Sequence, residues 1–155
     1  MSDEFETVEA TIDEIHDAIE AGQLTSRELV EDYLDRIDRY DRNGPELNSI
    51  VTENDAAVDR AIELDERREA AGLVGPLHGI PVLVKDQAET AGIRTTFGSE
   101  ACADHVPETD ATIVSKLKAA GAIVLAKTSL PDFAAAYFGY SSMTGQTKNP
   151  YDLDR

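Results

Sequence analysis

Two short apolar segments in the second half of the chain limit most strongly how it can fold. GIPVLVK, from Gly79 to Lys85, and AIVLA, from Ala122 to Ala126, contain several β-branched residues and have no polar face. Such segments are typical of parallel strands that are covered on both sides. Between them lies a helical pattern that Thr109 or Asp110 caps and Gly121 closes. Because crossovers of this kind are nearly always right-handed, we predict a βαβ unit with two parallel strands.

The first half of the chain is predicted to be mainly helical. Two T-x-x-E capping boxes, which begin at Thr11 and Thr25, precede apolar residues at helical spacing. LNSIVT at 47–52 predicts a short strand, and Asn54 or Asp55 then opens a third helix. Nothing in this half of the chain indicates chemistry.

The chain, residues 1–155, is predicted to be the N-terminal portion of one α/β domain. Residues 1–72 would be mainly helical, and residues 73–155 would begin the α/β core. After AIVLA we expect a last short helix from Ser129, with Pro131 in its first turn, and then a polar loop. Two strands and one crossover helix cannot cover both faces of a sheet, so we expect the domain to be incomplete.

The chain is strongly acidic, with a net charge of -17 from 31 acidic and 14 basic residues. It would repel phosphate backbones and anionic membranes, which excludes nucleic acids and membranes as expected partners. Residues 1–70 hold 22 of the acidic residues and only 7 basic ones, on what we predict to be solvated helix faces. The excess also suits a halophilic protein, and a comparison of unfolding at low salt and in molar potassium chloride would test this hypothesis.

No apolar run approaches the roughly 18 residues that a membrane-spanning helix needs. The acidic N-terminus is also unlike a signal peptide, so we expect a soluble cytoplasmic protein. The single cysteine, Cys102, cannot form an internal disulfide, and no close pair of histidines accompanies it. We therefore expect neither a metal site nor a cofactor.

Lys85 is the strongest candidate for chemistry. It stands at the end of an apolar strand, where partial desolvation can leave some of the amine neutral and basic near pH 7. Ligands of open α/β sheets also collect beyond the carboxyl ends of the strands. The alternative is that Lys85 extends into water or pairs with Asp86, and on spacing alone this alternative is the more common one.

Other polar residues offer weaker patterns. His78, Ser99 and Asp110 supply the residue types of a Ser-His-Asp triad, but no serine lies in a G-x-S-x-G strand-to-helix turn. The glycine-rich segments lack the G-x-G-x-x-G and G-K-[ST] patterns of dinucleotide and phosphate sites. The serine-rich segment at 141–144 could approach a ligand, although turn chemistry explains it equally well.

Three segments closely resemble the amidase signature family: GPLHGIPVLVKDQAETAGIRTTFGSE at 75–100, DATIVSKLKAAGAIVLAKTSLPDFA at 110–134 and GQTKNPYD at 145–152. The helical patterns before them are also similar to the start of that family, so the resemblance covers nearly the whole chain. It implies a mixed, largely parallel sheet covered by helices. This chain would supply the N-terminal helices and the first βαβ unit.

The resemblance also implies hydrolysis of amides by a Ser, cis-Ser, Lys triad. Lys85 matches the base that acts through the cis-serine on the nucleophilic serine. In the family both serines follow an N-P-[WY]-D element, here Asn149 to Asp152, so they would lie beyond Arg155. We therefore expect the chain to be inactive alone. By the same likeness, the substrate-binding residues of the acyl pocket would be Ala134, Ala136 and Tyr137.

The predicted function is an amidohydrolase that cleaves a carbon-nitrogen bond of a small-molecule amide through a seryl acyl-enzyme. One alternative is the glutaminase subunit of an aminoacyl-tRNA amidotransferase, which would need partner subunits. Gln87 and Ser129 argue against it, because the family usually has Asn after Lys-Asp and often has Asn after Lys-Thr.

Another alternative comes from a different class: a truncated, non-catalytic fragment that binds other chains through its strand edges. Whether the protein forms a homo-oligomer is left open. The residues encoded after Arg155 would separate these hypotheses, since G-G-S-S-G-G there would support the enzyme and a stop codon would favour the fragment.

Overall fold

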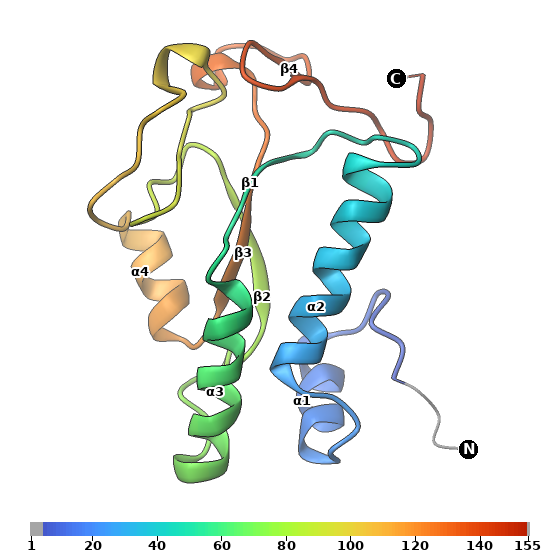
Figure 1. The fold of residues 1–155 in the computed structure, drawn as a ribbon, viewed down its shortest axis with the longest axis vertical. Helices are drawn as coiled ribbons and strands as arrows, with labels where there is room; N and C mark the ends of the chain where they lie inside the picture. Colours follow the sequence, from blue (N-terminus) through green and yellow to red (C-terminus); the bar gives the residue numbers. More distant parts are fainter. Residues whose placement is uncertain (1–4, 155) are drawn as a thin grey trace.

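A three-stranded mixed sheet forms the centre of the computed structural model, which describes residues 5–154 (Figure 1). Its strands are β1 (Ile50–Glu53), β2 (Pro81–Lys85) and β3 (Ile123–Thr128). β3 is central and runs parallel to β2 and antiparallel to β1. The predicted α/β class and the βαβ unit are confirmed. Residues 1–4 and 155, which the predicted domain includes, lie outside the described residues.

The α-helices of the described residues are α1 (Ile12–Glu20), α2 (Ser26–Arg36), α3 (Ala57–Ala71) and α4 (Thr112–Ala119). Both predicted capping boxes are present, at Thr11 and Thr25. α2 continues into a π-helical turn, η1 (Ile37–Arg42), so the helical segment is as long as its pattern predicts. None of the helices between residues 5 and 154 has the length and apolar content that crossing a membrane requires.

Helices cover both faces of the sheet because alternate side chains of β3 point into two separate cores. The α2 and α3 side contains Val30, Leu64, Ile123 and Leu125, and the α4 side contains Val84, Val114 and Val124. In Figure 1 the sheet accordingly lies between α4 and α2. Burial of these apolar side chains, at about 25 cal/mol per Å² removed from water, holds the two helical layers on the sheet.

β2 is less buried than its sequence predicts. It is one of the two outer strands of the described sheet, and Leu83 is 53% exposed. Leu83 and Pro81 line an open apolar groove of about 350 Å³ between the sheet and the end of α2. The predicted covering on both sides therefore holds for β3, whereas the exposure of β2 agrees with the prediction that the domain is incomplete.

Two predictions about helix ends are also wrong. Asp110 does not cap α4, because its carboxylate accepts hydrogen bonds from Ala91 N–H and Lys118 Nζ, both at 2.8 Å. In place of a helix from Ser129 there is a single 3₁₀ turn, η3 (Asp132–Ala134). Residues 133–140 are all exposed, so a longer helix there would bury no apolar face in the described structure.

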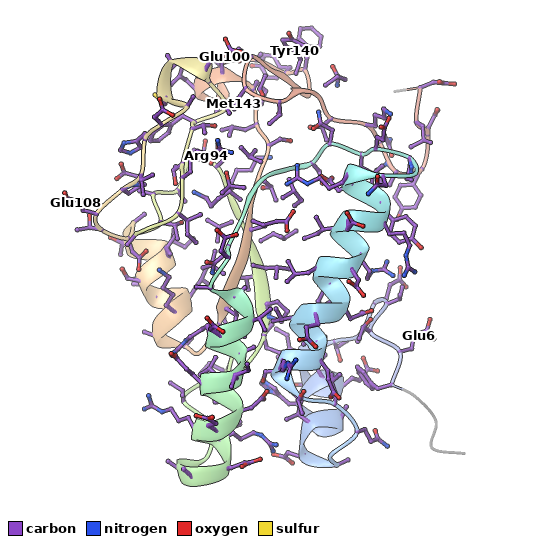
Figure 2. The ribbon with its side chains drawn as sticks, viewed as in Figure 1. Glu6, Arg94, Glu100, Glu108, Tyr140 and Met143 are labelled. Atoms are coloured by element: carbon purple, nitrogen blue, oxygen red, sulfur yellow. The ribbon has the colours of Figure 1, made fainter. Side chains whose placement is uncertain are left out.

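The carboxyl ends of β2 and β3 lie side by side, with Lys85 in register with Thr128. The remaining elements, η2 (Glu100–Cys102), η3, β4 (Tyr140–Ser141) and β5 (Gly145–Gln146), belong to the loops at this end. Figure 2 shows Glu100, Tyr140 and Met143 close together there, and Met143 N–H donates to Gly98 O at 3.4 Å. Loops at the carboxyl ends of parallel strands are the usual place for ligands in α/β sheets.

The buried His78 makes stability depend on pH. His78 is only 1% exposed. Its Nδ1 accepts a hydrogen bond from Val74 N–H at 3.0 Å, and its Nε2–H donates one to Leu64 O at 3.0 Å. Both bonds together require the neutral ring. Burial lowers the pKa of His78 from its ordinary value of 6.5, although the bond to Leu64 opposes the shift.

We therefore expect the free energy of unfolding to fall as the pH drops below 6.5, because the unfolded chain then binds a proton that the folded chain excludes. Above that pH this contribution is fully present. Urea unfolding at about pH 7.5, 6.5 and 5.5 measures the effect. His78→Gln is the control, since it keeps the other histidines. A wild-type dependence no steeper than that of the variant would contradict the prediction.

Candidate active site

Lys85 lines a small cavity at the carboxyl edge of the sheet. Its Nζ donates a hydrogen bond to the backbone carbonyl of Ser129, the residue after β3. The cavity has a volume of about 210 Å³, and its walls are Lys85, residues 128–131, Ser49, Gly139 and Thr147. Lys85 is exposed, so the predicted desolvation of its ammonium is not found in the described part of the chain. The position of β2 at the edge of the sheet is the reason.

Hydroxyl groups surround this cavity, and sequence reasoning missed most of them. Thr147 Oγ1 donates to Asn48 O at 2.9 Å, so the 2.6 Å contact between Ser129 and Thr147 must have the Ser129 hydroxyl as its donor. Ser129 N–H also donates to Ser49 O at 2.7 Å. The cavity is thus assembled from β2, the end of β3, the segment before β1 and the loop after β5.

Asp41 fixes the segment that brings Ser49 to the cavity. Its buried carboxylate accepts from Ser49 N–H at 2.6 Å, from the Ser49 hydroxyl at 2.5 Å and from Ile50 N–H at 3.1 Å. One carboxylate at the end of η1 therefore holds the start of β1 in place. No local pattern in the sequence marks this role.

Asp86 does not pair with Lys85, which rules out one alternative considered for that lysine. Both Asp86 and Lys127 are fully buried, and Lys127 Nζ lies 3.8 Å from Asp86 Oδ1. Lys127 Nζ also donates to Ala88 O at 2.8 Å and to Thr95 Oγ1 at 2.6 Å. Burial lowers the pKa of Lys127, and the neighbouring Asp86 charge opposes this shift.

His78, Ser99 and Asp110 do not form a triad. His78 bonds only to backbone groups, Ser99 Oγ accepts from Ala101 N–H at 3.4 Å, and Asp110 is bound by Lys118. No hydrogen bond joins any two of the three within residues 5–154. Cys102 is free and partly exposed, and the described residues contain no group of three His, Cys, Asp or Glu side chains that could hold a metal ion.

The residues predicted to bind substrate are not among the walls of the cavity. Ala134, Ala136 and Tyr137 are all exposed, and Tyr137 has no covered surface at all. The serine-rich segment beside them is held by hydrogen bonds within the chain. Ser142 donates to the Asp132 carboxylate through its N–H at 2.8 Å and through its hydroxyl at 2.5 Å. These two bonds hold the pKa of Asp132 below its usual value.

A family model described as Amidase matches residues 28–155, which include the βαβ unit, Lys85 and every wall of its cavity. The chain belongs to the amidase signature family. The predicted resemblance is confirmed.

Curated relatives of this amidase-family chain include a glutamyl-tRNA(Gln) amidotransferase subunit from Geobacter metallireducens. It is 40% identical over 150 residues, which are 97% of this chain and 30% of that protein. The protein of the same name from Alkaliphilus metalliredigens is 40% identical over 149 residues, with 95% and 30% covered. The chain therefore spans about 30% of the length of these curated relatives.

Solved amidase structures superpose on nearly the whole chain. Peptide amidase in complex with the inhibitor chymostatin has a TM-score of 0.90 and 39% identity, covering 96% of this chain and 31% of that one. The native peptide amidase of Stenotrophomonas maltophilia has a TM-score of 0.88 and 39% identity, with 94% and 31% covered. An amidase family protein of Bacillus anthracis has a TM-score of 0.88 and 39% identity, with 94% and 30% covered.

Proposed function

We propose that the chain is the N-terminal portion of an amidase domain and supplies the base of its active site. Lys85 is that base, and the bond that breaks is the carbon-nitrogen bond of a small-molecule amide. The observation that carries this proposal is the position of Lys85. Its amine lines a hydroxyl-rich cavity at the carboxyl ends of two parallel strands, in a chain of the amidase family.

The chemistry needs two serines that would lie beyond Arg155. A neutral Lys85 amine would accept the proton of a cis-serine hydroxyl, which in turn takes the proton of the nucleophilic serine. The serine oxygen then bonds to the amide carbon, the carbon-nitrogen bond breaks, and the leaving amine takes up a proton. Water next attacks the acyl-enzyme and releases the acid. No metal or cofactor enters these steps, and Ala134, Ala136 and Tyr137 remain the proposed substrate contacts.

A chimera tests this proposal directly. Residues 1–155 would replace the matching 31% of the Stenotrophomonas maltophilia peptide amidase, to which they are 39% identical. We expect the chimera to hydrolyse an aryl amide and the 155-residue chain alone to show no turnover. The parent enzyme is the positive control. A folded chimera without activity, or turnover by the chain alone, would contradict the proposal.

The glutaminase subunit of an aminoacyl-tRNA amidotransferase is a second candidate. The names of the curated relatives favour it, whereas Gln87 and Ser129 depart from the pattern expected of that branch. The two candidates differ in their need for partners. Glutamine hydrolysis that appears only with partner subunits bound would support the amidotransferase, and partner-independent hydrolysis of simple amides would support the amidase.

The third candidate, a non-catalytic fragment that binds other chains, rests on the outer edge of β2 and the exposed Leu83. The same edge would let the chain self-associate into a homo-oligomer. Light scattering on the 155-residue chain distinguishes these outcomes from a monomer.

A further inference from the structure

The buried pair of Asp86 and Lys127 has no part in the proton transfers, although one of its members, Asp86, is the chain neighbour of the proposed base. Asp86 follows Lys85 in the chain, and its N–H donates to Thr128 O at 3.0 Å. Both side chains of the pair have no exposed surface. A charged pair with this burial is retained only where its hydrogen bonds are satisfied, because removal of one partner leaves an uncompensated charge.

The Asp86 carboxylate holds a turn in the chain at residues 96–98. It accepts from Thr96 N–H at 3.0 Å, from the Thr96 hydroxyl and from Gly98 N–H at 3.4 Å. Phe97 N–H donates to Asp86 O at 3.0 Å. Main-chain and side-chain oxygens of a single residue therefore bind three consecutive residues of this turn.

The same turn supports a wall of the Lys85 cavity. Gly98 packs so closely on the backbone that a Cβ atom there would lie 2.3 Å from Leu130 O and 2.9 Å from Pro131 O. Leu130 and Pro131 are cavity walls. Phe133 N–H, just beyond them, donates to Phe97 O at 2.8 Å. Asp86 is thus connected to the cavity along two routes, through its chain neighbour Lys85 and through the wall formed by Leu130 and Pro131.

We propose that Asp86 and Lys127 are a positioning pair for Lys85: Asp86 fixes the strand end and the cavity wall, and Lys127 cancels the Asp86 charge. This inference rests on the proposed role of Lys85 as the base. Without Lys127, the Asp86 anion would be left uncompensated one residue along the chain from Lys85, and its charge would favour the protonated form of the Lys85 amine. Glu89 is a further charged group near the pair: it interacts with Lys127, and its Oε1 lies 3.1 Å from His105 Nε2.

Competitive acetylation of the 155-residue chain tests the pair without using amide hydrolysis. Trace acetic anhydride is applied between about pH 7 and 10, and mass spectrometry gives the rate at Lys85 relative to the exposed Lys116 of α4 in the same sample. The variants are Lys127→Met, Asp86→Asn and the double variant. Lys118→Met is the matched control, because it removes the lysine of another Lys–Asp pair, with Asp110.

We expect Lys127→Met to slow the acetylation of Lys85 at about pH 8 by at least about threefold and to move its pH profile upward. Asp86→Asn should leave the rate within about twofold or raise it, and the double variant should return it to within about twofold of wild type. Lys118→Met should change nothing at Lys85. Such opposed effects cannot come from unfolding, which would change Lys85 in one direction in all variants of the pair.

The proposal would be overturned if Lys85 were acetylated at the wild-type rate in Lys127→Met. It would also be overturned if either the double variant or Asp86→Asn were as slow as Lys127→Met. If Lys127→Met fails to fold, the acetylation rates of Lys85 in Asp86→Asn and in the double variant decide. A rate more than about twofold below wild type in either variant would then overturn the proposal. The proposed function fails separately: a chimera that stays active without Lys85 would refute the base and leave the measured charge coupling intact.

Discussion

Replacement of Lys85 by Ala in the chimera should reduce kcat/KM for amide hydrolysis by at least about 10²-fold, or about 2.7 kcal/mol of transition-state stabilisation. The substitution removes the only group in the proposed mechanism that accepts the relayed proton. Lys85→Arg should fail as well, because a guanidinium remains protonated near neutral pH. The measurement is steady-state hydrolysis of an aryl amide at about pH 8.

The fold should survive the loss of this side chain, because Lys85 is exposed at a strand end. Lys116→Ala in the same chimera is the matched control, since Lys116 is also exposed and lies on α4, outside the cavity. Its activity should stay within about twofold of the chimera. If Lys85→Ala kept activity within about tenfold, or about 1.4 kcal/mol, Lys85 would not be the general base.

Gly98→Ala should lower the free energy of unfolding by about 2 to 5 kcal/mol. Gly98 has a φ of 72°, which costs a residue with a Cβ atom about 1 to 2 kcal/mol. The added carbon would also meet Leu130 O at 2.3 Å, and this contact is with backbone, which cannot rotate away. Relief of the overlap requires the 96–98 turn and the cavity wall to separate, at a further cost of about 1 to 3 kcal/mol.

Gly92→Ala separates the two costs. Gly92 has a φ of 75°, but a Cβ atom built there would have no neighbour within 4 Å. Its substitution should therefore cost only about 1 kcal/mol from the backbone. Urea unfolding of both variants gives the comparison. Equal losses for the two glycines would show that the close approach of Gly98 to Leu130 does not stabilise the fold.

Local patterns predicted the elements whose cause is local. The capping boxes at Thr11 and Thr25 work within a few residues, and the apolar spacing that follows them places one helix face in the core. The continuous burial of β3, on both faces of the sheet, also follows from its own apolar composition. These features could be predicted because no distant segment competes with them.

Predictions failed where a distant segment decides the outcome. Asp110 has the residue type of a helix cap, but Lys118 and the Ala91 amide bind its carboxylate. Asp86 neighbours Lys85 in sequence, yet its partner Lys127 comes from β3. β2 has the composition of a strand covered on both sides, but the exposure of its side chains depends on which other segments pack against it.

The candidate site divides in the same way. Lys85 could be found because a charge ends an apolar strand, and this pattern is visible in one short segment. Ser49 and Thr147 could not, since they reach the cavity from segments almost 100 residues apart and no local pattern places them there. Tertiary contacts select these two hydroxyls.

The strand order has a consequence for how the chain is made. β1 and β2 lie on opposite sides of β3 and do not pair with each other, while β3 is the last of the three to be synthesised. On the ribosome, the four helices α1 to α4 and both flanking strands must therefore emerge, followed by β3 itself, before the first strand pair of this sheet can form. Residues 123–128 complete both pairings at once, so the flanking strands stay unpaired within the sheet, and open to aggregation, until translation has passed that segment.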